Sequence, residues 1–285
     1  MKITSDWHIH SGNSCDCACM KMSALIESAA AKGITDFGVS DHLHSLYNLP
    51  DIQASRREFL ACGPGPRFHF GVEASCVSRW ELEEIAAGRC QDPVYGIREG
   101  GPPGAPLAVA LTKEDIRTCG VEYVVGGTHW PIYVPLEREA IIRDYHRQNM
   151  FLAAHPLVDI VAHPWWWQGH WEKNGMFNAE PWFDDFDHVP RSMHEEFAAT
   201  AIQHETVVEI NLDANLLNGC YPERFKRQYL DYLAGLAERG VKLCIGSDCH
   251  NATYRVDFEK ASQMLDSVGI REDHLWRLPP RSEVA

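Results

Sequence analysis

The chain has 285 residues, 45% of them hydrophobic, and a formal net charge of −14. This length and apolar content allow a large core, and one α/β barrel domain spanning residues 1–285 is compatible with them. The acidity argues against a nucleic-acid-binding or anionic-membrane surface, because those partners require clustered Lys and Arg. We therefore expect neither a nucleic-acid polymer nor a membrane as partner, and the composition leaves the oligomeric state open.

No apolar signal core follows Lys2, because Thr4 and Ser5 are polar and Asp6 is charged. No apolar run approaches the roughly 18 residues of a membrane span. The 10 Cys are irregularly spaced, which is typical of reduced thiols rather than of a disulfide framework. These features predict a cytoplasmic protein. The dense run Cys15-Asp16-Cys17-Ala18-Cys19 is an exception that suggests a thiolate metal site, although no second Cys-x-x-Cys element accompanies it.

In chain order, short β-rich stretches alternate with helical ones. Residues 2–5 form the first strand, residues 21–32 a helix that ends at Gly33, and residues 35–40 the second strand, which together make a βαβ unit. The alternation continues with helices at 51–61, near 113–118, and at 137–154, 192–204 and 222–239, and with strands at 67–72, 121–125, 159–162, 207–210 and 242–245. Seven strands, each followed by a helix or helical loop, predict a parallel barrel.

Two stretches interrupt this alternation. Residues 88–106 are rich in Gly and Pro and predict a surface-loop insertion without regular structure. Residues 164–190 form a Trp-rich loop that either packs down as a satellite hydrophobic cluster or forms a lid or pocket wall over a site. Its aromatic residues are Trp165, Trp166, Trp167, Trp171, Phe177, Trp182, Phe183 and Phe186.

His and carboxylate residues recur where the predicted strands end. His8 and His10 are separated by one residue, and in a strand this spacing points both side chains to the same face. The later strands are followed or ended by Ser40-Asp41-His42, Glu73, Gly126-Gly127-Thr128-His129, His163-Pro164, Glu209-Ile210-Asn211 and Ser247-Asp248-Cys249-His250. In parallel barrels the loops at the carboxyl ends of the strands build the active site. The sequence therefore predicts a metal site at that end.

This ordered set of motifs resembles the PHP superfamily of metal-dependent phosphoesterases, which includes histidinol phosphatases and polymerase-associated PHP domains. The similarity spans nearly the whole chain. It implies a distorted (β/α)7 TIM-like barrel whose metal site lies at the C-terminal ends of the strands. It also implies a hydrolase that acts on a small-molecule phosphate ester.

Carried over residue by residue, the resemblance implies three divalent ions, which could be Zn, Mn or Fe. The implied ligands are His8, His10, Glu73 and Asp248 for the first ion, the bridging Glu73 with His129 and His163 for the second, and Asp16, His42 and His250 for the third. Asp16 stands where some relatives have His. Cys15 or Cys17 is an alternative ligand there, because thiolates favour zinc.

The ligand types indicate the chemistry. Two cations that share Glu73 can hold a hydroxide, lower the pKa of its parent water towards about 7 and clamp phosphate oxygens. Metal ions would neutralise the negative charge of the phosphate ester, which explains how an acidic protein can act on phosphates. We expect the catalytic residues to be Glu73, Asp248 and His250, together with His44. His44 is the candidate proton donor to the leaving group because His250 is committed as a ligand, although a loop His is often a surface residue.

The substrate is less constrained. Histidinol phosphatases tend to carry an Arg after the Glu-x-Asn motif, and residues 211–217 contain none, which weakens histidinol phosphate as the substrate. Trp165, Trp166 and Trp167 suggest a flat or apolar ligand such as a nucleotide or an aryl phosphate. Asn211 has either a pocket role or a role in a turn, and Arg255 is a candidate phosphate contact.

Two other functions stay open. A metal-dependent hydrolase or lyase of the same fold could act on a non-phosphate bond, because barrels of this kind support many chemistries. A non-catalytic metal-binding or polymerase-accessory module is disfavoured by the complete ligand set.

Overall fold

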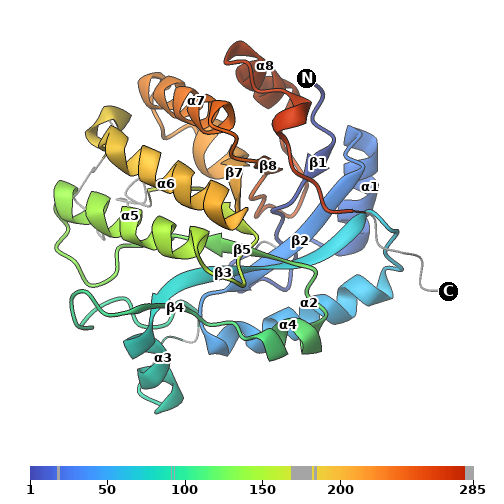
Figure 1. Ribbon diagram of the computed structural model, residues 1–285. Helices are drawn as coiled ribbons and strands as arrows, with labels where there is room; N and C mark the ends of the chain where they lie inside the picture. Colours follow the sequence, from blue (N-terminus) through green and yellow to red (C-terminus); the bar gives the residue numbers. More distant parts are fainter. Residues whose placement is uncertain (18–19, 91, 93, 168–181, 183–184, 280–285) are drawn as a thin grey trace.

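The computed structural model describes residues 1–17, 20–90, 92, 94–167, 182 and 185–279. A parallel sheet runs in the order β1-β2-β3-β5-β6-β7-β8 and curls into a nearly closed barrel with helices outside it (Figure 1). The strands are β1 (Ser5–Asp6), β2 (Asp36–Leu43), β3 (Phe68–Ser78), β5 (Tyr123–Gly127), β6 (Ile160–Ala162), β7 (Val207–Asn211) and β8 (Leu243–Gly246). The predicted seven-stranded parallel barrel is confirmed.

The barrel closes where β1 meets β8. The N–H of Trp7 donates to the carbonyl oxygen of Ile245 at 2.8 Å, and an isolated parallel bridge joins Ile9 to Cys249. Asp248 donates from its backbone N–H to the carbonyl oxygen of His8 at 2.7 Å. These bonds bring the first and the last predicted metal-binding motifs side by side.

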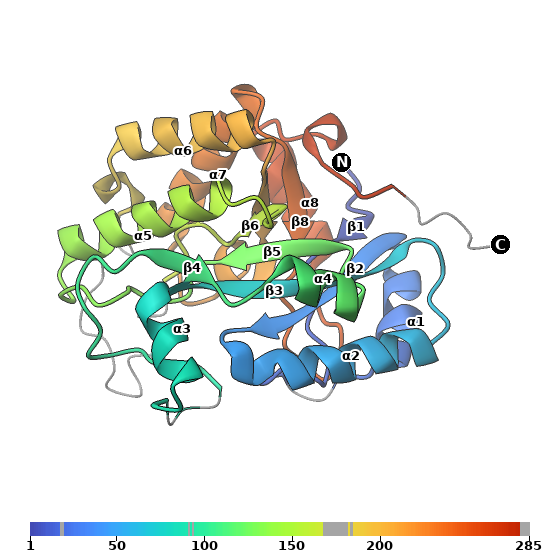
Figure 2. The same cartoon turned by 60° about the horizontal axis from the view of Figure 1, so that its bottom comes forward.

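Most helices begin and end within a few residues of the predicted positions. They are α1 (Met22–Lys32), α2 (Leu49–Ala61), α4 (Lys113–Cys119), α5 (Arg138–Ala153), α6 (Arg191–His204) and α7 (Glu223–Glu238). Helix α1 ends because Gly33 has φ 73°, a left-handed conformation that favours glycine. Helix α8 (Phe258–Ser267) was not predicted. Figure 2 shows α5 and α6 side by side on the outside of the sheet, and the two helices contact each other.

Strand β3 departs from the prediction because it continues to Ser78 instead of ending near residue 72. Beyond its pairing with β2 and β5, it pairs with the antiparallel strand β4 (Leu107–Val109). The unpredicted helix α3 (Arg79–Ala86) follows, and the Ser78 side chain caps it by accepting from the N–H of Glu81 at 2.9 Å. The Pro/Gly-rich segment 88–106 thus connects α3 to β4, and its described residues contain no helix or strand, as predicted.

An aromatic side chain fills the barrel interior beneath the site. The phenol of Tyr123 lies fully buried against Gly38 and Gly71, where a Cβ atom would collide with its ring. Its hydroxyl donates to the carbonyl oxygen of Trp7 at 2.8 Å. Because glycine leaves space for this ring, the barrel interior is a packed core at this level.

The Trp-rich loop is largely a packing element where the structure describes it. Trp165, Trp167 and Trp182 are at most 1% exposed, and the indole N–H of Trp182 donates to the carbonyl oxygen of Trp165 at 2.7 Å. Tyr145 of α5 contacts Trp182 edge to face. The described tryptophans thus pack as in the hydrophobic-cluster alternative, and Trp165 and Trp167, which the sequence suggested as substrate contacts, are buried in this cluster. Trp171, Phe177 and Phe183 lie outside the described residues.

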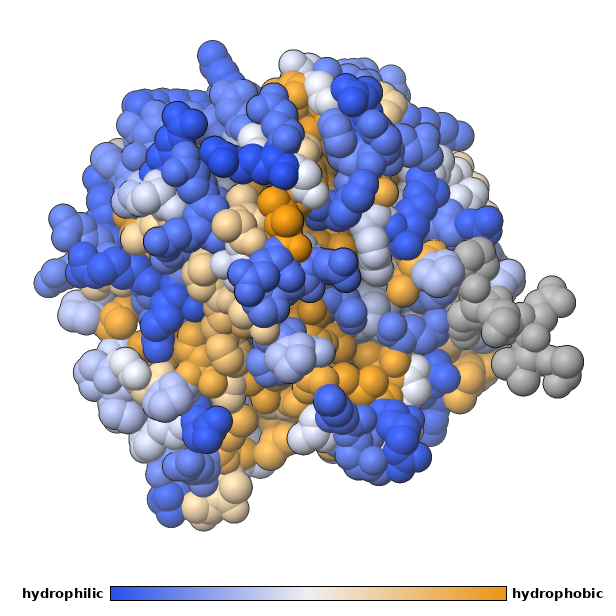
Figure 3. All heavy atoms as spheres, in the orientation of Figure 1, coloured by the Kyte–Doolittle hydropathy of each residue, from blue (hydrophilic) through white to orange (hydrophobic). Residues whose placement is uncertain are grey.

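The visible surface is mostly hydrophilic, as the charge implies. Figure 3 shows hydrophobic residues gathered over the region of β3 to β5. Within the described part of the chain, no helix is long and apolar enough to cross a membrane.

Candidate metal centre

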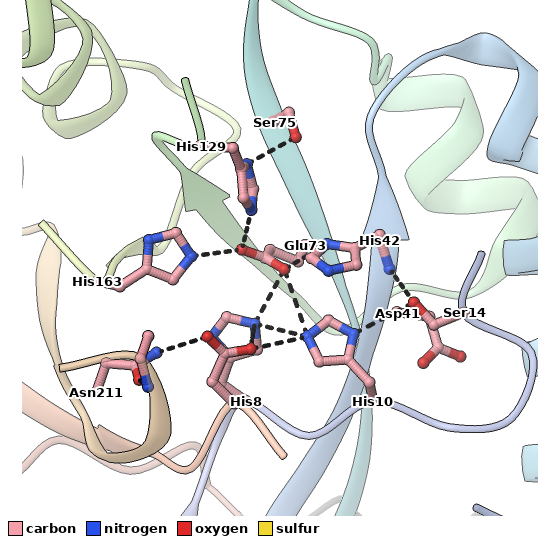
Figure 4. Close-up of polar contacts among 12 residues, drawn as sticks. His8, His10, Ser14, Asp41, His42, Glu73, Ser75, His129, His163 and Asn211 are labelled. Carbon is pink, nitrogen blue, oxygen red and sulfur yellow. Dashed lines mark hydrogen bonds and ion pairs between the residues drawn. The ribbon is translucent and has the colours of Figure 1, made fainter. Parts of the chain in front are cut away.

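All nine predicted ligands lie at the carboxyl ends of the barrel strands or in the loops beside them. Figure 4 shows six of them, five imidazoles around the Glu73 carboxylate, with the backbone of several strands converging on the site. His8 and His10 follow β1, His42 lies in β2, Glu73 in β3, His129 after β5, His163 after β6, Asp248 and His250 after β8, and Asp16 in the loop before α1.

Glu73 is the centre of the site and is fully buried. Each of its carboxylate oxygens faces different rings. Oε1 lies 3.0 Å from Nε2 of both His129 and His163. Oε2 lies 3.0 Å from Nε2 of His8, 3.5 Å from Nε2 of His10 and 2.6 Å from Nδ1 of His42. One carboxylate therefore spans two groups of imidazoles, as a bridging ligand would.

The possible ligand atoms form overlapping clusters in which the members lie within 4.8 Å of one another. Three clusters each share members with one predicted ligand set: His8, His10 and Asp248; Glu73, His129 and His163; and His10, His42 and His250. A fourth contains His42, His44 and His129. Asp16 reaches the third cluster, because its Oδ2 lies 3.2 Å from Nε2 of His42 and 3.7 Å from Nε2 of His250.

The donor geometry fits divalent cations. Several buried atoms of the cluster have no hydrogen-bond partner among the described residues, although ring nitrogens or carboxylate oxygens of neighbouring ligands lie close to them. These atoms are Oε2 of Glu73, Nε2 of His129 and Oδ1 of Asp248. Nε2 of His8 lies 3.1 Å from Nε2 of His10. Two nitrogens bound tetrahedrally to zinc at about 2.05 Å would be separated by about 3.3 Å. Buried lone pairs that approach one another in this way are expected of ligands that converge on an ion.

Charges within the cluster are strongly coupled. Burial raises the pKa of the Glu73 carboxyl, but the imidazoles of His8, His42 and His129 outweigh burial and hold that pKa well below its usual range. Burial likewise raises the pKa of Asp248, and His8 and His10 bring it well below the usual range. Both carboxylates are therefore ionised and available as metal ligands.

A second carboxylate, Glu209, lies behind the ligands. Its Oε1 accepts from Nδ1 of His8 at 2.7 Å, and its Oε2 accepts from the backbone N–H of His163 at 2.6 Å. Asn211 donates from Nδ2 to Glu209 at 2.9 Å and to Oδ2 of Asp248 at 3.1 Å. Gly246 on β8 leaves the space that Glu209 occupies, because a Cβ there would collide with this carboxylate. Such partners orient ligating rings.

Asn211 also starts a π-helical turn, Leu212–Leu216, by accepting on Oδ1 from the N–H of Ala214 at 2.8 Å. The turn alternative for Asn211 is thus correct. Asn211 is not among the residues that line the cavity above the ligand cluster, and its side-chain amide contacts Glu209 and Asp248.

Asp6 and Asp41, which precede ligating His residues, hold backbone segments. Asp6 accepts from the N–H groups of His8 and Ser247 at 3.2 and 2.8 Å. Asp41 accepts from the N–H and the hydroxyl of Ser11, both at 2.6 Å. These bonds fix the loops that carry the ligands.

Two ligands have unusual backbone conformations. His163 has φ 27° and Asp248 has φ 56°, in the left-handed region that residues other than glycine rarely adopt. Strain of this kind is typical of functional sites, where the surrounding structure enforces it. It also turns both side chains into the cluster instead of continuing the strand alternation.

The thiol of Cys17, beside Asp16, has other partners. The Cys17 thiol donates to the carbonyl oxygens of His250 at 3.4 Å and His10 at 3.7 Å, and burial together with Asp41 raises its pKa to about 12. In the described part of the chain the carboxylate, not a thiol, faces His42 and His250. Cys19 lies outside the described residues.

A cavity of about 390 Å³ opens above the cluster. Its non-ligand walls include three aromatic side chains, Tyr95, Trp130 and Trp166, and the polar residues His44, Asp213, Asn218 and Asn251. Burial, together with Asp248 and Asp6, raises the pKa of Asp213 to about 7. Tyr95 belongs to the insertion, and Asp213 to the π-helical turn.

Five aromatic or polar residues of the cavity wall were not predicted from the sequence: Tyr95, Trp130, Asp213, Asn218 and Asn251. Trp130 directly follows a ligand, so its position was the available signal. Tyr95 carried no signal, because the segment in which it lies looks like an ordinary loop.

The structure places the predicted substrate and proton-donor residues in different surroundings. Trp166 lines the cavity, whereas Trp165 and Trp167 are not among its lining residues. The Arg255 residue is exposed and is not part of the cavity wall. His44 is not a surface loop residue: it belongs to the segment immediately after β2 and is only 2% exposed.

The fold and the site together define an α/β TIM-like barrel with a cluster of His and carboxylate side chains that could hold metal ions. A similar solved structure is a Listeria monocytogenes protein provisionally designated a histidinol phosphatase. The TM-score is 0.57 at 10% sequence identity, with 87% of this chain and 96% of that chain covered. An old yellow enzyme homologue from Zymomonas mobilis aligns with a TM-score of 0.28 at 10% identity, over 93% of this chain and 81% of that one, which is too low to indicate a common fold.

No protein-family model and no curated protein sequence matches the chain. The structural similarity confirms the barrel expected from the PHP resemblance, at the level of the fold.

Proposed function

We propose that the protein is a metal-dependent phosphoesterase that hydrolyses a small-molecule phosphate ester. The observation that carries the proposal is the Glu73 carboxylate, whose two oxygens face separate groups of imidazoles at the catalytic end of a barrel. Three divalent ions would occupy the three clusters, with Asp16 completing the third. This site resembles the one expected from the sequence motifs.

Divalent ions held there would supply Lewis-acid chemistry, in that they lower the pKa of water and neutralise phosphate charge. The protein residues would do the rest. Glu73 would set the spacing of two ions, and Glu209 would keep the proton of His8 on Nδ1 so that Nε2 stays free as a ligand. The packed barrel interior beneath the site would exclude bulk water from that side and strengthen electrostatic interactions within the site.

The cavity walls support a substrate with a flat portion. Trp130 and Tyr95 lie edge to face, with ring centroids 6.3 Å apart, and Trp166 lies beside His163. Aromatic walls favour stacking with a planar leaving group. An aryl phosphate or a nucleotide is therefore preferred over an aliphatic phosphate.

A second candidate function follows from the charge of the cavity. None of the described residues that line it is Lys or Arg, and Asp213 faces it. A metal-dependent hydrolase or lyase of a non-phosphate bond is therefore the alternative. In the phosphoesterase proposal the metals must supply all of the positive charge.

The test is a substrate panel on metal-replete protein. Zinc-, manganese- and iron-loaded samples would be assayed with phosphomonoesters, phosphodiesters, lactones and amides, and the metal-stripped protein would be the control. We expect metal-dependent turnover of phosphate esters, with aryl esters preferred. Turnover confined to lactones or amides would favour the second candidate. Absence of turnover of every ester by protein that retains its metals would contradict the proposal.

A further inference from the structure

A buried serine links the predicted ligand His129 to His44. Ser75 lies two residues after Glu73 on β3, which places both side chains on the same face of the strand. Its Oγ lies 2.9 Å from Nδ1 of His129 and 2.7 Å from Nδ1 of His44. Figure 4 shows the bond between Ser75 and His129 on the side of the ring away from Glu73. Ser75 is completely buried.

The position of each proton follows from the proposed function. A neutral imidazole that binds a metal through Nε2 carries its proton on Nδ1. His129 faces Glu73 with Nε2, so its Nδ1–H donates to Ser75. A hydroxyl has one proton, and the two histidines are the partners that the structure gives to this one. If the Ser75 hydroxyl donates to Nδ1 of His44, its proton has a hydrogen-bond acceptor. If Ser75 instead accepted from both rings, its buried O–H would have no acceptor.

This chain of bonds leaves the proton of His44 on Nε2. That nitrogen is buried without a hydrogen-bond partner among the described residues, and His44 lines the cavity. The ring is held between its neighbours, stacked on His42 with centroids 4.3 Å apart and in contact with Trp130 at 5.3 Å. A buried donor without a partner is costly unless a ligand satisfies it.

We propose that His44 is a neutral hydrogen-bond donor that recognises an anionic oxygen of the substrate, and that Ser75 sets its tautomer. This inference rests on the proposed function. It assigns His44 a substrate-binding role in place of the expected role as proton donor to the leaving group, because a neutral imidazole N–H is a poor acid. In a cavity whose described walls contain no Lys or Arg, such a donor assists the metals in holding a phosphoryl group.

Two substitutions of His44 test the roles of its two ring nitrogens separately. The amide nitrogen of Gln reaches approximately to the position of Nε2, and that of Asn to the position of Nδ1. His44→Gln therefore keeps a donor towards the cavity, and His44→Asn keeps only a group beside Ser75. The dissociation constant of inorganic phosphate would be measured on zinc-loaded protein, with metal content determined for each sample.

We expect His44→Gln to bind phosphate within about threefold of the original protein and His44→Asn to bind it about 10- to 100-fold more weakly, because a hydrogen bond to a charged group is lost. Metal content should not change. Equal phosphate affinity in both variants would overturn the inference, and so would loss of metal from both, since that would make His44 a ligand.

Two further measurements do not depend on phosphate affinity. Long-range ¹H–¹⁵N spectra of the unsubstituted zinc-loaded protein should show His44 protonated on Nε2, and protonation on Nδ1 would overturn the assignment. For His44→Asn, turnover of 4-nitrophenyl phosphate and of glycerol phosphate should fall equally. A fall confined to glycerol phosphate, whose leaving group needs a proton, would show the general-acid role instead.

Failure of the proposed function can be distinguished from failure of the role assigned to His44. If unsubstituted, metal-loaded protein neither binds phosphate nor hydrolyses any phosphate ester, the phosphoesterase proposal and the inference that rests on it both fall. If it hydrolyses esters and the two variants behave alike, only the role of His44 is contradicted.

Discussion

Glu209 accepts a hydrogen bond from Nδ1 of His8 at 2.7 Å, on the side of the imidazole that faces away from Glu73. The ring is thereby clamped between two buried carboxylates, and its Nε2 points into the cluster. A carboxylate behind a ligating histidine fixes the ring orientation and raises the basicity of the ligand.

The first prediction concerns this contact. Glu209→Gln should weaken metal affinity by about 10- to 100-fold without unfolding the protein, because the amide cannot reproduce the charge behind His8. Competition with a chelator measures the affinity, and circular dichroism measures the fold. Glu205→Gln, an exposed position just before β7, is the matched control. Unchanged metal affinity in Glu209→Gln would show that the contact is only structural.

The second prediction concerns metal stoichiometry. We expect about three divalent ions per chain and, in Glu73→Gln, one ion or fewer, because the shared negative charge is lost from two clusters at once. Activity towards every substrate should fall together with the metal. Elemental analysis after metal-replete expression tests this. Glu122→Gln is the control, because Glu122 contacts His69 at 2.8 Å, at the beginning of β3 and outside the ligand cluster. Full metal content and rates in Glu73→Gln would exclude a bridging role.

The third prediction separates two adjacent tryptophans. Trp166 lines the cavity, whereas Trp167 is fully buried and its backbone N–H donates to the hydroxyl of Tyr221 at 2.7 Å. Trp166→Ala should raise KM for an aryl phosphate and leave metal content intact. Trp167→Ala should instead reduce the free energy of unfolding by about 3–5 kcal/mol. Steady-state kinetics and urea unfolding of both variants provide the comparison, and the reverse pattern would contradict the assignment.

The fourth prediction concerns pH and is independent of the metals. Burial, together with His146, lowers the pKa of His194 to about 4 from an ordinary value of 6.5. The unfolded chain therefore takes up a proton first as the pH falls, so stability is full above about pH 6.5 and is lost between there and about pH 4. Over that window the loss amounts to at most about 3 kcal/mol.

His194→Phe should remove this pH dependence, because the ring packs against Phe186 and Tyr232 without a titrating group. Urea unfolding at about pH 7 and about pH 5 should show a smaller loss than in the unsubstituted protein, by about 2 kcal/mol. His204→Gln, an exposed substitution on the same helix, is the control. An equal loss in His194→Phe would mean that other groups dominate acid sensitivity.

Local sequence information was sufficient for the order of the elements and for the end of the barrel that carries the chemistry. Gly33 ends α1 because glycine adopts the left-handed conformation readily, and this preference does not depend on contacts distant in sequence. His8 and His10 are separated by one residue, which places both rings on one face of the strand. Strand length was harder to predict. The continuation of β3 to Ser78 depends on its pairing with β4, which lies some thirty residues further along the chain.

Only the tertiary structure decided which neighbours in sequence act together. Trp165, Trp166 and Trp167 look equivalent in the sequence, yet the positive φ angles of His163 (27°) and Trp165 (69°) break the periodicity, so that one indole lines the cavity and two enter the core. The contact of Ser75 with both His44 and His129 joins three separate stretches of chain. No local pattern encodes such contacts, because they depend on strand register and barrel closure, which residues distant in sequence determine jointly.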